Sequence, residues 1–419
     1  MGEKIAGLDV LGPEYFTDPH AYHTRMRAQA AATEVVLPGG TKAWLVTRYE
    51  DARQALADQR FSKDYRAFPG IMQRNQVDGE EAGEFDSSLM QHMLNMDPPD
   101  HTRLRKLVTK AFTARRIEQL RSRVQEITDG LLDEMAAKAA TTDSATINSG
   151  MDLVDALSFP LPITVICEML DVPLDARDEF RVWSNTLVLG GPDAEAVQAA
   201  AGRMADYLTR LVDHKRANPG DDFFSELVHA EEGGERLDQL ELISMAFLLL
   251  VAGHETTVNL ITNGVHLLLR HPDQADRLRA DRSLLPGAVE EFLRYESPVN
   301  HATIRVTVED VEVGDVVIPK NSVVVVSLNG ANRDGDRFPD ADRFDITRPA
   351  GGHLAFGHGV HYCLGAPLAR MEGEIAIGSL LDRFDFALAA DPESLRWRQG
   401  TLMRGLESLP VSLTPRGPR

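Results

Sequence analysis

The chain has 419 residues, with 44 Lys and Arg against 64 Asp and Glu, which gives a formal net charge of −20 at pH 7. That sign excludes a general nucleic-acid binder, because neutralising phosphates takes a positive field. With 43% hydrophobic and 26% charged residues, the chain can bury a core, and its two cysteines are too few for a disulfide framework or a multi-cysteine zinc site. We therefore expect a globular protein of the reducing cytoplasm.

In the amino-terminal part, the sequence predicts one strand and one long stretch with breakers and clustered acids. A β-branched run beside a turn signal predicts a strand at residues 44–47. Residues 65–96 contain Pro69-Gly70 and five acids between Asp78 and Asp86. A stretch of this kind indicates a mobile lid or a channel wall.

A basic stretch at residues 101–116 runs against the overall charge. It contains no acid, and its cations are Arg103, Arg105, Lys106, Lys110, Arg115 and Arg116. It is either a solvated helix face or a docking surface for an acidic partner. Helical spacing predicts the next helix at residues 115–138, and Cys167 lies on an apolar helical face typical of a core.

The middle of the chain predicts helices at residues 194–218 and 238–271. The longest apolar run, Met245 to Ala252, is far short of the roughly 20 residues that a membrane-spanning helix needs, so no membrane anchor is expected. The 238–270 segment has no proline and would extend roughly 50 Å, as only a central helix could. Its middle reads Ala252-Gly-His-Glu-Thr-Thr257, where glycine and hydroxyls favour a local distortion. This polar turn is either a solvated kink or a functional site. Polar groups inside a central helix are costly to bury unless they serve a function.

The next elements are a helix at residues 285–295, a hairpin at 311–319 and a strand at 323–327. Glu291 and Arg294 lie three apart on this helix, where such a pair is ordinarily a weak surface contact. The expected fold class is mainly α with a small β portion.

The second cysteine, Cys363, follows glycines at 357 and 359 and precedes Gly365, with a helical pattern over 364–380. Amides at a helix start stabilise a thiolate, which suits a nucleophile or a soft metal ligand. A structural cysteine would not need the glycines, a nucleophile would need a histidine base, and zinc would need four donors. The loop also lacks the third glycine of a dinucleotide fingerprint.

The loop from Phe356 to Ala369 resembles the haem-binding signature of the cytochrome P450 family. Other segments resemble that family in order: 97–105, the 252–257 turn as the oxygen-binding groove, Glu291 with Arg294, and the meander at 331–348. The resemblance covers nearly the whole chain and is closest to soluble actinobacterial enzymes that hydroxylate macrolides, other polyketides or secosteroids. It implies a triangular prism with a long central helix over the haem, and a single domain over residues 1–419.

The resemblance implies heme b as cofactor, with Cys363 as the axial iron ligand. The remaining cofactor-binding positions are Ala252, Phe356 and Gly365 beside the haem and, at its propionates, His101, Arg105, Arg305 and His361. Thr256 and Glu255 are implied as the proton-delivering catalytic pair, while His254 has no assigned role. Glu291, Arg294 and Arg348 are implied to form a structural network behind the loop.

The substrate pocket is expected to be mostly apolar and to take a bulky lipophilic molecule. Its expected lining is Leu248, Val251, Val299, Thr303, Leu402 and Met403. Since no flavin or nicotinamide domain is present in the sequence, electrons are expected from a ferredoxin and its reductase, docking on 101–116, and the protein is expected to be a monomer. The alternatives are a peroxide-using hydroxylase, an epoxidase, and a haem sensor without turnover. The Glu255–Thr256 pair favours a dioxygen-activating enzyme over the sensor and the peroxide user.

Overall fold

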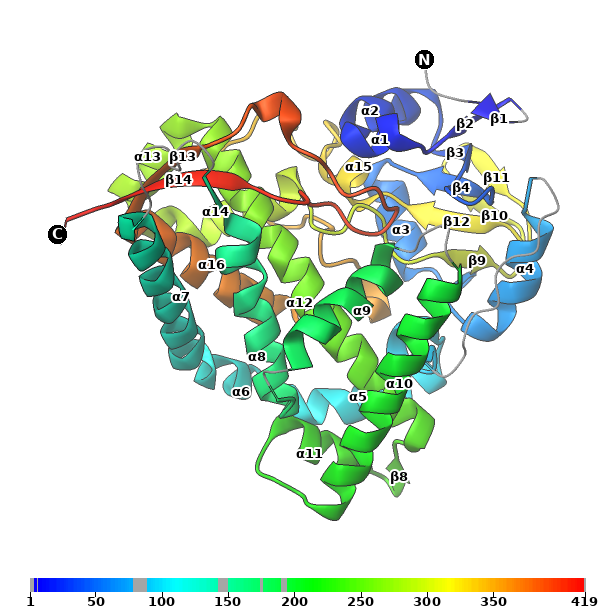
Figure 1. The fold of residues 1–419 in the computed structure, drawn as a ribbon. Helices are drawn as coiled ribbons and strands as arrows, with labels where there is room; N and C mark the ends of the chain where they lie inside the picture. Colours follow the sequence, from blue (N-terminus) through cyan, green and yellow to red (C-terminus); the bar gives the residue numbers. More distant parts are fainter. Residues whose placement is uncertain are drawn as a thin grey trace.

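The computed structural model describes residues 4–5, 7–77, 89–141, 150–173, 176–189 and 194–417. Helices fill the larger part of the molecule, and most of the strands gather at one side of it, as Figure 1 shows. The α-helices are α1 (Pro13–Thr17), α2 (Pro19–Gln29), α3 (Tyr49–Ala57), α4 (Phe68–Arg74), α5 (Asp100–Ala111), α6 (Ala114–Gln119), α7 (Arg121–Thr141), α8 (Pro160–Leu170), α9 (Arg177–Leu189), α10 (Ala194–Ala217), α11 (Phe223–His229), α12 (Gln239–Arg270), α13 (Pro272–Ala280), α14 (Leu285–Tyr295), α15 (Leu328–Asn332) and α16 (Ala366–Arg383). The mainly α fold class is confirmed.

The strands form one larger sheet and several short pairings. They are β1 (Lys4–Ile5), β2 (Leu8–Val10), β3 (Ala32–Val36), β4 (Lys42–Val46), β5 (Phe61–Ser62), β6 (Met151–Asp152), β7 (Glu231–Glu232), β8 (Glu235–Arg236), β9 (Arg305–Thr307), β10 (Val311–Val313), β11 (Val316–Ile318), β12 (Val323–Val326), β13 (Phe384–Leu388) and β14 (Pro410–Pro415). The larger sheet has seven strands in the order β1-β2-β3-β4-β12-β9-β5. In it β12 pairs parallel with β4, and β9 pairs antiparallel with both β12 and β5.

Helix α12 runs through the centre of the helical part (Figure 1). It begins at a capping box in which Asp238 accepts from the amide of Glu241 and the Glu241 carboxylate accepts from that of Asp238, which satisfies two free amides. The helix is long and apolar enough to cross a membrane, but 78% of its most apolar window is buried inside the protein. It is therefore the core helix around which α8, α10, α14 and α16 pack.

The expected distortion at residues 252–257 does not occur, because α12 is one uninterrupted α-helix from residue 239 to 270. The Thr256 hydroxyl donates to the carbonyl of Ala252 at 2.8 Å, which uses that oxygen's second lone pair and leaves the helix intact. His254 and Glu255 find partners on other segments, so the polar turn costs the helix no backbone bonds.

The helix expected at residues 115–138 is two helices in the structure. Helix α6 ends at Gln119 and α7 begins at Arg121. The amide of Leu120 bonds to the carbonyl of Ile117 at 3.0 Å, three residues earlier, so the chain tightens there before α7 continues. The other expected helices and strands are confirmed within a few residues, and the predicted boundaries of α14 are those of the structure.

Candidate functional site

Cys363 lies in a loop whose backbone requires glycine. Gly357 and Gly359 have φ of 74° and 75°, and a Cβ on Gly359 would lie 2.9 Å from the Cα of Ala57 on α3. The amide of Cys363 donates to the carbonyl of Phe356 at 2.9 Å. These constraints hold the thiol just before α16, as the sequence predicts.

Burial is the main influence on this thiol and raises the pKa of Cys363 above its usual value. Hydrogen bonds from the amides of Gly365 and Ala366, and the charge of Arg105, offset only part of that rise. A thiol that burial keeps protonated is a poor free nucleophile. The arrangement instead suits a sulfur that becomes anionic when a metal cation binds it.

The sulfur faces a cavity of about 280 Å³ between α12, the loop and α16. Most of the other lining is apolar, and Cys363 is exposed to this space. Expected site residues that line the cavity are His101, Arg105, Leu248, Ala252, Thr256, Val299, Thr303, Arg305, Phe356, His361, Gly365, Leu402 and Met403. Glu255 and Val251 are buried but do not line it.

The basic side chains of the cavity wall converge. The His101 and His361 rings lie 4.4 Å apart, and Arg305 donates to the carbonyls of Phe61 and Leu56 at 3.2 Å. Arg105 donates to the carbonyl of Tyr362 at 2.7 Å. No Asp or Glu of the described residues lines this cavity.

Lys63 is a cavity residue that the sequence reasoning missed. It follows β5, is 1% exposed, and its ammonium contacts the Thr303 hydroxyl. Within the described part of the chain, no carboxylate lies at ion-pair distance from it. Burial and the charge of Arg305 lower its pKa well below the usual range, and the charge of Asp97 offsets only part of that fall. No local signal marks a lysine after a two-residue strand, because its position depends on the pairing of β5 with β9.

These cations lack the partners that buried charges need. Both ring nitrogens of His101 and the Nε of Arg305 are buried without a hydrogen-bond partner. Burial, with Lys63 and His101 nearby, lowers the pKa of His361 to about 2, and burial lowers that of Arg305 to about 10. An isolated buried cation is costly, so the wall is built for a ligand that brings anionic oxygens.

Neighbouring residues of α12 at the cavity face in different directions. Ala252 and Thr256 face the cavity, whereas a Cβ on Gly253 would lie 3.0 Å from Ile166 on α8. Gly253 also borders the cavity, and its lack of a side chain allows α8 to pack closely against α12. Glu255 points away, where Ser184 on α9 donates to it at 3.2 Å and the guanidinium of Arg398 lies 3.5 Å away.

Behind the loop, Glu291 and Arg294 are fully buried and joined at 2.7 and 2.8 Å. Arg294 also donates to the carbonyls of Asn332 and Ala341 at 2.9 Å, and Arg348 lies 3.5 Å from Glu291. The expected network therefore exists, and it is an internal pair rather than a surface contact. Cys167 is buried in the core, as expected.

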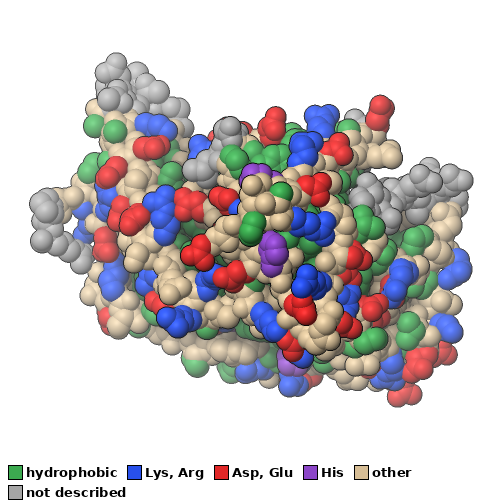
Figure 2. Space-filling model, turned by 90° about the horizontal axis from the view of Figure 1, so that it is seen from below, with side chains coloured by type: hydrophobic (Ala, Val, Ile, Leu, Met, Phe, Trp, Pro, Cys, Tyr) green, Lys and Arg blue, Asp and Glu red, His purple; other side chains and the backbone are tan. Residues whose placement is uncertain are grey.

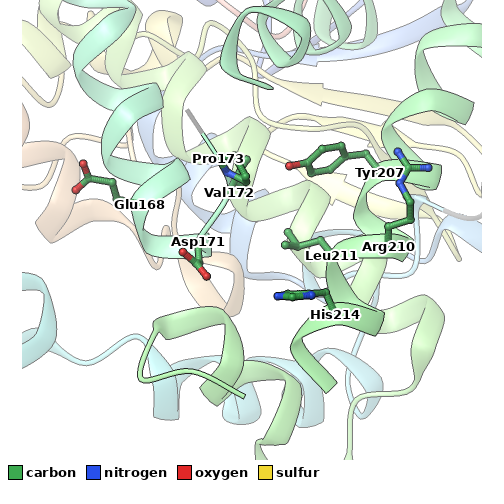
Figure 3. A pocket seen from close by; sticks show the side chains of 8 residues that line it. All are labelled: Glu168, Asp171, Val172, Pro173, Tyr207, Arg210, Leu211 and His214. Atoms are coloured by element: carbon green, nitrogen blue, oxygen red, sulfur yellow. The ribbon is translucent and has the colours of Figure 1, made fainter. Parts of the chain in front are cut away.

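A second pocket, shown in Figure 3, lies between the end of α8 and α10. Its acids already have partners: Glu168 is paired with Arg123 at 2.8 Å, and Asp171 with Lys215 at 2.5 Å. It therefore differs from the cavity beside Cys363, where no carboxylate of the described residues lies within ion-pair distance of the basic side chains. The charge of Asp97 acts on Lys63, His101 and Arg305 only from a longer distance.

The basic stretch at 101–116 is largely neutralised by acids that follow α10 in the chain. Lys106 and Lys110 both pair with Glu232, and the other pairs are Arg103 with Glu241 and Arg116 with Glu226. Figure 2 shows the face below the view of Figure 1, where basic and acidic side chains are interspersed. The isolated positive surface that the sequence suggests is thus a mixed one. The acids between Asp78 and Asp86 lie outside the described residues.

Comparison with known proteins gives consistent results. The cytochrome P450 family profile matches residues 178–405. Cytochrome P450 107B1 of Saccharopolyspora erythraea is 54% identical over 97% of this chain and 98% of its own, and vitamin D(3) 25-hydroxylase of Pseudonocardia autotrophica is 46% identical over 97% of each. The solved structure of the P450 monooxygenase TamI bound to tirandamycin C has 50% identity and a TM-score of 0.87, covering 97% of this chain and all of that one.

Proposed function

This chain belongs to the cytochrome P450 family and is a haem-thiolate monooxygenase, and we propose that it inserts one oxygen atom into a bulky lipophilic molecule such as a macrolide, another polyketide, a terpenoid or a secosteroid. The observation that carries the site assignment is a cavity lined by six basic side chains and, among the described residues, by no Asp or Glu, with a single thiol at its base. The basic residues are Lys63, His101, Arg105, Arg305, His358 and His361. The apolar residues Leu248, Val299, Leu402 and Met403 on its other walls support a lipophilic substrate. The vitamin D(3) hydroxylase and the tirandamycin-bound relative support the same class.

The residues fit heme b, whose two carboxylates match the cations that lack partners. Cys363 would be the axial ligand, and Gly365 and Ala366 would donate their amides to its sulfur. When bound, the haem supplies reductive activation of dioxygen and transfer of one oxygen atom. The carboxylates would be held by His101, Arg105, Arg305 and His361, with Lys63 as a further basic group, while Phe356 would pack beside the haem and the small side chain of Ala252 would leave room for it.

Thr256 and Glu255 are proposed to carry protons into the cavity. The Thr256 hydroxyl lies on the cavity wall, and its proton is held on the Ala252 carbonyl at 2.8 Å. Glu255 stands directly behind it in the helix, away from the apolar substrate wall. A proton that comes from Glu255 would therefore reach Thr256 from inside the protein rather than across the substrate wall. The same pair favours a monooxygenase over a peroxide-using hydroxylase, and the choice between hydroxylation and epoxidation depends on the substrate.

We propose that a ferredoxin and its reductase supply the electrons and that the protein acts as a cytoplasmic monomer. Lys106, Lys110 and Arg115 are the exposed cations on the basic stretch that would meet an acidic ferredoxin. We also propose that residues 1–419 act as a single domain, since β4 and β12 pair across most of the chain.

A carbon monoxide difference spectrum of the reduced protein tests the site. We expect the long-wavelength Soret band of a thiolate-bound haem in the wild type and in Cys167→Ala, the matched control. Cys363→His should keep haem but lose that band. A wild type without the band would refute the assignment of Cys363. Type I spectral shifts with a macrolide, a polyene and vitamin D3 then rank the substrate classes.

Thr256→Ala tests the proton path. The variant should retain haem with an unchanged carbon monoxide spectrum, but it should divert electrons from NADPH into hydrogen peroxide instead of product. Peroxide release for each NADPH consumed measures the effect. An unchanged ratio of product to NADPH would refute a role for Thr256 in proton delivery.

A further inference from the structure

His254 is a fully buried histidine with a defined hydrogen-bonding direction. Its Nδ1 lies 2.7 Å from the carbonyl oxygen of Leu250, one turn earlier on α12. Because a carbonyl oxygen only accepts, Nδ1 carries a hydrogen. The other ring nitrogen, Nε2, lies 3.3 Å from Oε1 of Glu255 and 3.2 Å from the hydroxyl of Ser184.

A proton count follows from these contacts. A neutral ring with its hydrogen on Nδ1 would turn the lone pair of Nε2 toward the carboxylate of Glu255, and two acceptors repel. Ser184 has one hydroxyl hydrogen and three acceptors within reach, which are Nε2 of His254 and Oε1 of Glu255 at 3.2 Å and the carbonyl of Arg181 at 3.3 Å, so it can satisfy only one of them. The contact between Nε2 and Oε1 is favourable only if a further proton lies between them, on the ring or on the carboxyl group.

The surroundings hold this proton in a closed site. From α9, Ser184 and Asn185 face the pair, and Asn185 accepts from Arg398 at 2.9 Å. Arg398 itself approaches Oε2 of Glu255 at 3.5 Å. The ring of Phe159 covers His254 at 6.1 Å, with the guanidinium of Arg181 4.4 Å from the Phe159 ring and paired with Asp155. Burial alone would raise the pKa of Glu255. The bond to His254 and the charges of His254 and Arg398 outweigh burial, so the pKa of Glu255 lies below its usual value.

We propose that His254 is a positioning residue that shares a stored proton with Glu255 and aims its carboxylate, so that one of the two protons consumed per dioxygen is already present beside Thr256. This inference rests on the proposed monooxygenase function. In the step, the proton leaves Nε2 for Oε1. Because the Glu255 carboxyl faces Ser184 and Arg398 rather than the cavity, it hands the proton to the Thr256 hydroxyl only after its side chain turns toward that residue. The ring is left neutral with its hydrogen on Nδ1, and solvent water returns a proton to it.

The stored proton can be observed without turnover. In the reduced, carbon monoxide-bound holoenzyme labelled with ¹⁵N-histidine, the His254 signal is identified by its loss in His254→Gln. We expect either a protonated Nε2, or a neutral ring together with a protonated carboxyl stretch in the infrared spectrum that disappears in Glu255→Gln. A neutral ring with no such carboxyl stretch would overturn the proposal.

The pH profile separates proton storage from mere packing. His254→Gln keeps an amide donor near Glu255 but cannot hold the proton, whereas His254→Phe removes the donor as well. With ferredoxin as donor and vitamin D3 as probe substrate, we expect product per NADPH to fall about tenfold in His254→Gln, with the decline toward high pH beginning at lower pH than in the wild type. His254→Phe should lose more, because Glu255 is also no longer aimed.

His266→Gln is the matched control, since His266 is buried on the same helix but contacts Trp397 rather than Glu255. It should leave the profile unchanged. An unaltered profile in His254→Gln would overturn the proposal. If vitamin D3 is not turned over, the two spectroscopic measurements decide. A missing Soret band in the wild type would instead count against the proposed function, which distinguishes the two failures.

Discussion

Two groups of buried charges lie on either side of the Cys363 loop, and they are handled in opposite ways. Behind the loop, Arg294 has a carboxylate and two carbonyls as partners within 3 Å. On the cavity wall, Lys63 and His101 are equally buried, but no carboxylate of the described residues forms an ion pair with either of them. A buried charge that the protein pairs itself stabilises the fold, whereas one left unpaired toward a cavity indicates the charge of a ligand. The number of partners that a buried charge has, rather than its degree of burial, therefore distinguishes a structural residue from a ligand-binding one.

The largest effect is expected where the internal pair is broken. Arg294→Met leaves the fully buried Glu291 carboxylate without its partner and frees the carbonyls of Asn332 and Ala341. We expect a loss of about 3–5 kcal/mol in the free energy of unfolding and a sharply lower yield of folded protein. Arg121→Met, which breaks the exposed pair with Glu118, should leave thermal unfolding unchanged. Equal melting of the two variants would invalidate the comparison.

A third kind of buried charge sharpens the comparison. Glu372 is 1% exposed, one of its carboxyl oxygens has no partner, and burial raises its pKa from the usual 4.5 to about 8. The folded chain therefore binds this proton between pH 4.5 and about 8 while the unfolded chain does not, so the group lowers stability as the pH rises through that window. Glu372→Gln should raise the free energy of unfolding by roughly 3 kcal/mol at pH 7 and have little effect at pH 4.5. Urea unfolding at both pH values measures the difference, and an equal gain at both would contradict the pKa.

Lys63→Met should have an effect on stability opposite to that of Arg294→Met, while weakening haem binding. Removing an unpaired buried ammonium should raise the melting temperature of the haem-free chain, because the cost of burying that charge disappears. It should also speed haem loss to excess apomyoglobin about tenfold, because a charge-assisted hydrogen bond to a carboxylate is lost. Lys42→Met on β4, outside the cavity, should change neither rate nor melting. If the variant lost haem faster and its haem-free form also melted at a lower temperature, Lys63 would be a structural residue like Arg294 and not a ligand-binding one.

The smallest effect is expected at the exposed pairs. Charge reversal of Lys106 and Lys110 should raise the apparent KM for ferredoxin about threefold at low salt, and the effect should vanish at high salt. The effect is modest because Glu232 already neutralises both lysines. Glu232→Gln should lower the same KM by freeing them. Insensitivity to mutation and salt would remove this face as the docking surface.

The sequence predicts well those features whose signals are local. Helix α12 is marked by its helical spacing and by the absence of proline, and the Cys363 loop by its glycines. Lys63 could not be found in this way, since β5 and β9 bring it beside Arg305 across 242 positions of chain. The acids that neutralise Lys106 and Arg116 are also far from them in the sequence. The local sequence of the basic stretch therefore suggests a more positive surface than the folded protein has. Val251, which the sequence also suggests for the substrate pocket, is buried but does not line the cavity, because helical spacing does not give the direction in which a buried side chain points.

The parallel pairing of β4 with β12 joins Trp44 to Val324 and has a consequence for biosynthesis. At 5–20 residues per second, a ribosome takes about 14–56 s to make the 280 residues between them. Until then β4 lacks its central neighbour, and the loop of Cys363 is made later still. The amino-terminal segment must therefore wait in an incomplete sheet during translation, where its unpaired edge is open to chaperones, and cofactor loading can begin only near the end of synthesis.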